Sequence, residues 1–180
     1  MIIGGVDLET TGLMEPEHRI IECCIIKYEW DGVTAKHLSS KTWRINPQRS
    51  IDAKAQKVHK ISEADLIGSP TFSGVASEIA EELDGCDVVC AHNGLSFDFP
   101  FLAKELERVR CDLPDFEIFD TMTSGRWATG MGEVPSLQAL CYACGVIYQE
   151  DLAHAAEYDV EKMLDCLFYG LRRKVYTLPI

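Results

Sequence analysis

The chain has 180 residues, 47% of them hydrophobic, and a formal net charge of −12. This length and composition predict one globular domain over residues 1–180, with no apolar run near the roughly 20 residues that a membrane span needs. The negative charge argues against a protein that coats duplex nucleic acid through a broad basic surface. It leaves room for an enzyme that grips a few nucleotides through metal ions.

The residue pattern predicts three strands in succession, followed by alternating helices and strands. Strands are expected over 2–6, 19–28, 37–45, 86–91 and 116–120, with a polar loop at 14–18 and a hairpin turn at Asp31-Gly32. Helices are expected over 51–58, 71–83, 98–110, 121–128, 136–144 and 155–171. This order predicts an α/β fold in which helices flank one mixed five-stranded sheet.

Eight cysteines are present, but their spacing does not form a disulfide framework. Cys141 and Cys144 form one C-x-x-C pair without a second pair at zinc-site spacing. Reduced, mostly buried thiols are therefore favoured over a structural zinc. The first residues also lack the basic n-region of a signal peptide, so we expect a cytoplasmic protein.

Two carboxylates close the first predicted strand. Asp7 and Glu9 are separated by one residue, so a strand would place both on the same face, with no basic residue near them in the sequence. Like charges held together are unfavourable unless something neutralises them, and oxygen ligands suit Mg²⁺ or Mn²⁺. The alternative is a solvated strand end followed by the turn at Thr10-Thr11-Gly12.

A second acid follows the predicted strand 86–91. Asp98 stands among Phe97, Phe99 and Phe101, where an acid is either a helix cap or a ligand. The preceding Asn93-Gly94 allows a left-handed turn, and Phe97 offers a face on which a base could stack.

A third pair lies near the end of the chain. His154 and Asp159 are five residues apart, which on a continuous helix is a rotation of about 140°, so their side chains would diverge. They converge only if His154 lies in a loop and Asp159 within the helix that follows. A simple surface histidine is the alternative for His154, and it is favoured when this segment is considered alone.

Taken together, the three segments supply four carboxylates and one histidine, which is what two-metal phosphodiester hydrolysis requires. The segments Val6–Leu13, His92–Pro100 and His154–Asp159 resemble the three motifs of the DEDDh family of 3′→5′ exonucleases, which have a ribonuclease-H-like fold. The second segment is most similar to the form in TREX-type DNA exonucleases. The matching segments run from residue 2 to about residue 166.

The resemblance implies a role for each of these five residues. Asp7, Glu9, Asp98 and Asp159 would hold two Mg²⁺ ions, for which Mn²⁺ could substitute, and His154 would be the general base.

The resemblance also implies a set of substrate-binding residues. His59 would lie near the 3′-terminal nucleotide, although Lys60 stands where the family usually has glycine. The other residues expected at the substrate are Thr10, Thr11, Gly12, Leu13, Asn93 and Phe97.

We therefore expect a metal-dependent 3′→5′ exonuclease that acts mainly on single-stranded DNA or frayed 3′ ends and releases nucleoside 5′-monophosphates. RNA trimming is an alternative, because the sequence does not locate a contact to the 2′-hydroxyl. A polymerase-associated proofreading subunit is another, although the loop from His92 to Asp98 is one residue longer than in bacterial proofreading subunits. A non-catalytic nucleic-acid-binding module is disfavoured because none of the five residues is lost. A polymerase partner and a homodimer are both compatible with the sequence.

Overall fold

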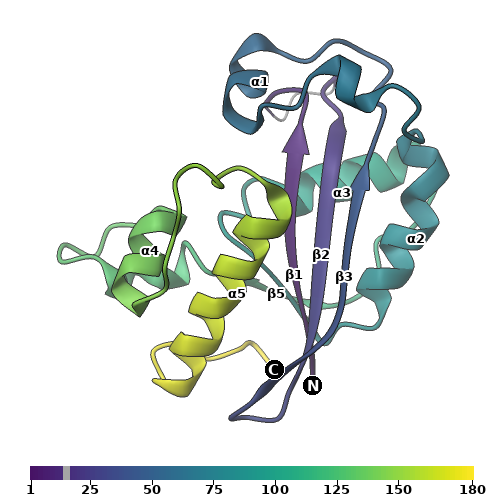
Figure 1. The fold of residues 1–180 in the computed structure, drawn as a ribbon. Coiled ribbons are helices and arrows are strands. Elements are labelled where there is room, and N and C mark those ends of the chain that lie inside the picture. The colour runs from purple at the N-terminus through teal and green to yellow at the C-terminus, as the bar shows by residue number, and fades with distance from the viewer. Residues whose placement is uncertain (14–16) are drawn as a thin grey trace.

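The computed structural model describes residues 1–13 and 17–180, so residues 14–16 of the predicted polar loop lie outside the described part of the chain. Five strands form one mixed sheet (Figure 1) in the order β3-β2-β1-β4-β5. The central strand β1 pairs antiparallel with β2 and parallel with β4. The strands are β1 (Ile2–Thr10), β2 (Ile20–Trp30), β3 (Ala35–Arg44), β4 (Val88–Ala91) and β5 (Glu117–Asp120).

Helices of two kinds lie between β3 and β4, between β4 and β5, and after β5. The α-helices are α1 (Ala53–His59), α2 (Phe72–Asp84), α3 (Asp98–Arg108), α4 (Leu137–Cys144) and α5 (Ala156–Arg172), and the 3₁₀ helices are η1 (Glu63–Leu66) and η2 (Ser124–Ala128). The helix predicted over 121–128 is thus reduced to η2. The carboxylate of Asp120 accepts hydrogen bonds from the backbone N–H groups of Met122 and Thr123, which offers this segment an alternative to a regular helix.

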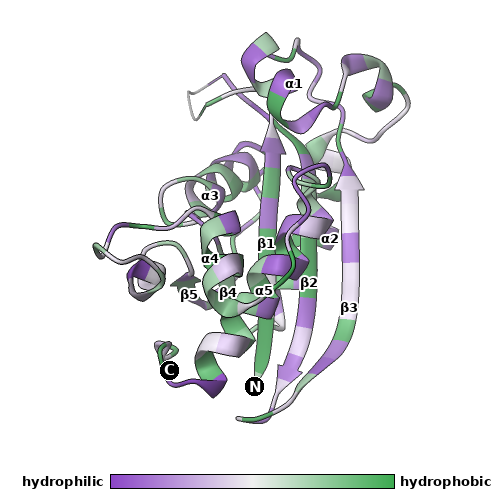
Figure 2. Ribbon diagram, turned by 60° about the vertical axis from the view of Figure 1, so that its left-hand side comes forward, coloured by the Kyte–Doolittle hydropathy of each residue, from purple (hydrophilic) through white to green (hydrophobic). Residues whose placement is uncertain are grey.

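The sheet is covered on both faces, as its apolar strands require (Figures 1 and 2). Helices α2 and α3 pack on one face, where Ile79 and Leu102 join Val6 and Leu8 of β1 in a buried cluster. Helix α5 packs on the opposite face, where its residues Val160, Met163, Leu164 and Leu167 bury Ile3 of β1 and Ile26 of β2. None of the described helices is long and apolar enough to cross a membrane.

Gly5 allows α5 to approach β1 closely. A Cβ atom at this position would lie 2.9 Å from side-chain atoms of both Val160 and Leu164, closer than packed carbon atoms come. Asp7, two residues further along β1, points to the same face. The close approach therefore brings the start of α5 next to the acidic end of β1.

Strand β1 also runs past its parallel neighbour. β4 pairs only with Ile3, Gly4 and Gly5, whereas β1 continues to Thr10. The last residues of β1 therefore project beyond the edge at which the parallel strands β4 and β5 end. In open α/β sheets this carboxyl edge is the usual place for a ligand.

Candidate active site

The acids predicted from three separate segments come together at this edge of the sheet. Asp7 and Glu9 lie on β1 and are partly exposed, whereas Asp98 in α3 and Asp159 in α5 are buried. Asp98 accepts a hydrogen bond from the backbone N–H of Leu8, the residue between Asp7 and Glu9, and Asp159 lines the same cavity as Asp7. Their convergence across residues 7 to 159 is a property of the fold.

Asp98 reaches β1 from the opposite face of the sheet. It is the first residue of α3, not the cap, and its Oδ1 accepts a hydrogen bond from the backbone N–H of Leu8 at 3.1 Å. β4 pairs only with Ile3, Gly4 and Gly5, so it does not reach the N–H of Leu8. The Asp98 carboxylate therefore supplies an acceptor for a backbone donor that β4 leaves unpaired. Asp98 is thereby fixed beside Asp7 and Glu9.

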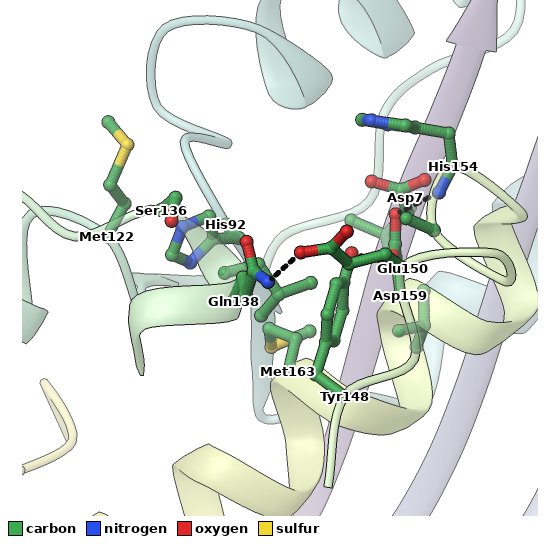
Figure 3. A pocket seen from close by; sticks show the side chains of 14 residues that line it. Asp7, His92, Met122, Ser136, Gln138, Tyr148, Glu150, His154, Asp159 and Met163 are labelled. Carbon is green, nitrogen blue, oxygen red and sulfur yellow. Dashed lines mark hydrogen bonds between the residues drawn. The ribbon is translucent and has the colours of Figure 1, made fainter. Parts of the chain in front are cut away.

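Asp159 is held at the start of α5 by two hydrogen bonds. Its Oδ1 accepts one from the Tyr148 hydroxyl at 2.9 Å, and its Oδ2 accepts one from the backbone N–H of His154 at 3.0 Å. His154 itself lies in the turn before α5 with a φ of 63°, so the prediction that it precedes the helix is confirmed. Its exposed imidazole extends away from Asp159 (Figure 3).

Burial and mutual repulsion make the carboxylates reluctant to ionise. Burial, followed by Asp98, Glu9 and Asp159, raises the pKa of Asp7 well above its ordinary value. Burial, followed by Glu22 and Asp159, raises the pKa of Glu9 to about 8. Burial raises the pKa of Asp98 to about 7, against the effect of its backbone hydrogen bonds. Full ionisation of these groups would therefore place more negative charge in the site than its surroundings balance.

A fifth carboxylate and a basic residue also belong to this neighbourhood. Glu22 of β2 lies opposite Glu9 in the sheet and is buried, and it forms an ion pair with Arg44 of β3. The charge of Arg44 lowers the pKa of Glu9, so a basic residue that is distant in the sequence lies near the acids in the fold. Arg44 is 35 residues from Glu9 and reaches it only through strand pairing. The signal available in the sequence was that Glu22 is the one charged residue among the otherwise apolar residues 20–26 of β2.

The substrate residues predicted after β1 surround a cavity of about 490 Å³. Leu13 is 79% exposed at this cavity. The other lining residues used below are Glu9, Thr10, Gly12, Lys54, Val58, His59 and Phe97. Thr11 does not line it, because its buried hydroxyl contacts His18 and accepts a hydrogen bond from the backbone of Arg19. Thr11 therefore shapes the loop from within.

His59 presents one ring nitrogen to this region. Its Nδ1 accepts a hydrogen bond from the backbone N–H of Ile61 at 3.0 Å, which places the proton of the neutral ring on Nε2. By distance and angle that buried Nε2 has no hydrogen-bond partner within the described residues, although the Thr10 backbone lies close enough to raise the pKa of His59 against the larger, opposite effect of burial. Lys60 follows with a φ of 61°, a left-handed conformation that favours glycine and explains the glycine usual at this position.

The loop before Asp98 is organised by a buried acid at the end of β5. Asn93 has a φ of 74°, as expected for a left-handed turn, and its backbone N–H donates to Asp120. The backbone N–H of Leu95 donates to the same carboxylate. Asn93 does not line the cavity of Leu13 and His59, whereas Phe97 does.

A second cavity, of about 510 Å³, adjoins the acids on the α4 and α5 side (Figure 3). Asp7, Asp159, His154 and Tyr148 line it together with His92 and Gln138. The Gln138 amide donates a hydrogen bond to Glu150 across this space at 2.6 Å. Tyr148 and Glu22 are the contributors that the three-motif pattern did not reveal.

The donor set fits hard divalent cations. All the converging side chains are carboxylates, and their raised pKa values show that a positive charge would stabilise their ionised forms. Within residues 1–13 and 17–180, no three or more His, Cys, Asp or Glu side chains are already arranged as a metal-binding group.

Comparisons with known proteins identify relatives of the chain. A family model described as an exonuclease, of the RNase T type, matches residues 5–167. The chain is 31% identical over 175 residues to the 3′-5′ exonuclease DinG of Bacillus subtilis, covering 97% of the chain and 18% of that protein. It is 28% identical over 166 residues to the DNA polymerase III subunit epsilon of Escherichia coli, covering 87% of the chain and 65% of that protein. It thus spans less than two thirds of these relatives.

Solved structures share the fold. A zinc-bound complex of Escherichia coli exonuclease I with single-stranded DNA superposes with a TM-score of 0.81 at 16% identity, over 96% of this chain and 41% of that chain. Exonuclease X in complex with 5′-overhanging duplex DNA superposes with a TM-score of 0.67 at 24% identity, over 98% and 95% of the two chains. These likenesses confirm the ribonuclease-H-like fold, and the match over residues 5–167 shows that the chain belongs to the RNase T-type exonuclease family, as its resemblance to the DEDDh enzymes predicted.

Proposed function

We propose that this chain is a single-domain 3′→5′ exonuclease that hydrolyses the terminal phosphodiester bonds of single-stranded DNA and releases nucleoside 5′-monophosphates. The observation that carries the proposal is the meeting of Asp7, Glu9, Asp98 and Asp159 at one end of β1, where burial raises the pKa of each carboxyl group. Glu9 also borders a cavity whose lining includes Leu13, Val58 and Phe97. Such an acidic site would repel a phosphate unless cations neutralised it. The activity is therefore expected to depend on a divalent metal.

The four carboxylates would hold the cations. Mg²⁺ is the proposed ion, with Mn²⁺ as a substitute, because both accept oxygen ligands. When bound, the ions supply a lowered pKa for water and a positive charge near the departing oxygen. Asp98 is already fixed by the Leu8 backbone, and Asp159 by Tyr148 and His154, so both acids are held in place before ions bind.

His154 is proposed as the general base. Its imidazole is exposed, on a turn whose backbone is attached to Asp159, so it is available to a water molecule approaching the scissile phosphate. Imidazole is the side chain that most readily accepts a proton near neutral pH. His154 lies outside α5 and Asp159 within it, so the two residues are proposed to have different roles. Asp159 would hold a metal ion, and His154 would accept the proton of the attacking water.

The cavity beyond Glu9 is proposed to receive the 3′-terminal nucleotide. Leu13, Val58 and Phe97 supply apolar and aromatic surface for a base, and the Nε2–H of His59 is a donor for an oxygen of the sugar or phosphate. Lys54 lines the same cavity and adds a positive charge. A base can enter only after leaving its partner, so single-stranded or frayed ends are the preferred substrates.

The test is digestion of 5′-labelled single-stranded DNA and RNA of the same sequence, with Mg²⁺ or with a chelator. We expect a ladder that shortens from the 3′ end, mononucleotide products, faster cleavage of DNA, and no cleavage in chelator. Asp7→Ala is the matched inactive control. Faster cleavage of RNA would show that RNA, and not DNA, is the preferred substrate. Cleavage without metal, or release of mononucleotides from the 5′ end, would refute the proposal.

The relatives named as polymerase subunits make association with a DNA polymerase a further proposal. Co-purification of a polymerase with the tagged chain, at a constant molar ratio through gel filtration, would support it. A chain that elutes alone, and is fully active, would favour a free-standing enzyme.

A further inference from the structure

Tyr148 makes a hydrogen bond to a proposed metal ligand from outside the three motifs. It follows α4 and precedes the turn of His154, and its hydroxyl donates to Asp159 Oδ1 at 2.9 Å. Its ring lines the cavity beside Asp7 and Asp159 (Figure 3). The tyrosine therefore touches the acid from the side of the site on which α4 and its following loop lie.

Asp159 is constrained at both of its oxygens. The Tyr148 hydroxyl occupies one lone pair of Oδ1, and the backbone N–H of His154 occupies one lone pair of Oδ2. An ionised carboxylate has about four acceptor positions, so each oxygen keeps one for another partner. Two donors at opposite oxygens fix the rotation of the carboxylate, which would otherwise be set by the arriving cation.

The segment that carries Tyr148 is attached to α5 a second time. The backbone N–H of Gln149 donates to the Tyr158 hydroxyl at 2.6 Å, and the rings of Tyr148 and Tyr158 pack with their centroids 5.5 Å apart. Residues 148–149 are thus fastened to the first turn of α5 at two adjacent points. Only one of the two attachments involves the carboxylate of Asp159.

We propose that Tyr148 is a positioning residue that sets the orientation of the Asp159 carboxylate for cation binding. The inference rests on the proposed function, in which Asp159 is a metal ligand. Hydrogen bonds behind a metal ligand reduce the freedom it must lose when the ion binds, and their removal commonly costs 10–100-fold in metal affinity or activity. Because Tyr148 lies in the segment that leads to His154, its hydrogen bond also attaches this segment to Asp159.

Two tyrosine-to-phenylalanine variants separate the positioning role from a general effect on the loop. Tyr148→Phe keeps the ring and removes the donor to Asp159. Tyr158→Phe removes the neighbouring bond to Gln149 and leaves Asp159 untouched. Mn²⁺ binding to the DNA-free protein is measured by titration calorimetry, melting temperature by scanning calorimetry, and kcat and KM at several Mn²⁺ concentrations.

We expect Tyr148→Phe to weaken Mn²⁺ binding about tenfold, with a melting temperature in chelator close to that of the unaltered protein. Its kcat should fall at low Mn²⁺ and recover at high Mn²⁺, with little change in KM for DNA. Tyr158→Phe should bind Mn²⁺ as the unaltered protein does. Unchanged affinity in Tyr148→Phe, or an equal loss in both variants, would overturn the positioning role.

The same measurements distinguish an error in the proposed function from an error in the role of Tyr148. If the unaltered protein bound no Mn²⁺, or bound it equally well after Asp159→Ala, then Asp159 would not be a metal ligand and the proposed function would be wrong at this residue. Asp159-dependent binding that is indifferent to Tyr148→Phe would overturn only the inference about Tyr148.

Discussion

The stability of the metal-free protein should fall as pH rises, because folding gathers carboxylates that resist ionisation. The size of the effect can be calculated from Glu9, whose pKa rises from an ordinary 4.5 to about 8 on folding. A carboxyl group with a raised folded-state pKa stabilises the fold fully below its unfolded pKa, and this contribution is lost as pH rises through the folded pKa. The window for Glu9 is therefore pH 4.5 to about 8.

The expected magnitude follows from proton linkage. Between pH 5 and pH 8, Glu9 alone should remove about 3 kcal/mol from the free energy of unfolding. In a domain of this size, each kcal/mol moves the melting temperature by about 2–4 °C, so the expected fall is roughly 10 °C. Asp98, with a pKa of about 7, acts in the same direction within this window. Mg²⁺ should oppose the fall because it binds the folded, ionised cluster.

The assay is scanning calorimetry from pH 5 to pH 8 in chelator and in Mg²⁺, on the unaltered protein and Glu9→Gln. The variant cannot ionise at this position, so its melting temperature in chelator should exceed that of the unaltered protein at pH 8 and match it near pH 5. Buried His59, whose pKa is lowered, contributes the opposite slope but does so equally in both proteins. Parallel curves for the two proteins in chelator would refute the reasoning.

Four further results are expected. Asp7→Ala and Asp98→Ala should each abolish Mg²⁺-dependent cleavage. In chelator only Asp98→Ala should lower the melting temperature, because only this change leaves the Leu8 N–H without its acceptor. If either variant still cleaved DNA, the substituted acid would not belong to the active site. His154→Ala should lose about 10²–10⁴-fold in kcat while keeping Mn²⁺ affinity; loss of Mn²⁺ binding as severe as in Asp159→Ala would make His154 a ligand. Phe97→Ala should raise KM for single-stranded DNA more than it lowers kcat, since stacking is worth about 1–3 kcal/mol per base; an unchanged KM would place the base elsewhere. Lys60→Gly should raise the free energy of unfolding in urea by up to about 1 kcal/mol, by relieving the left-handed backbone, and Lys60→Ala should not; destabilisation by glycine would show that the Lys60 side chain stabilises the turn.

The sequence alone predicted the local placement of the acids. The spacing of Asp7 and Glu9 places both on one face of a strand, and the five-residue separation of His154 and Asp159 requires a loop before the helix. Both inferences depend only on local geometry, because the spacing of residues along a strand or helix determines which side chains share a face. The structure confirms both, together with the mixed sheet that the order of strands and helices predicted.

The tertiary structure decided how those acids meet and what surrounds them. The close approach of α5 at Gly5, the reach of Arg44 through two strand pairings and the bond from Tyr148 to Asp159 each join residues distant in the chain. No local period encodes such contacts, because they depend on the strand register and on which helix face packs against the sheet. The same reason explains η2, where Asp120 competes for backbone donors that a regular helix would use.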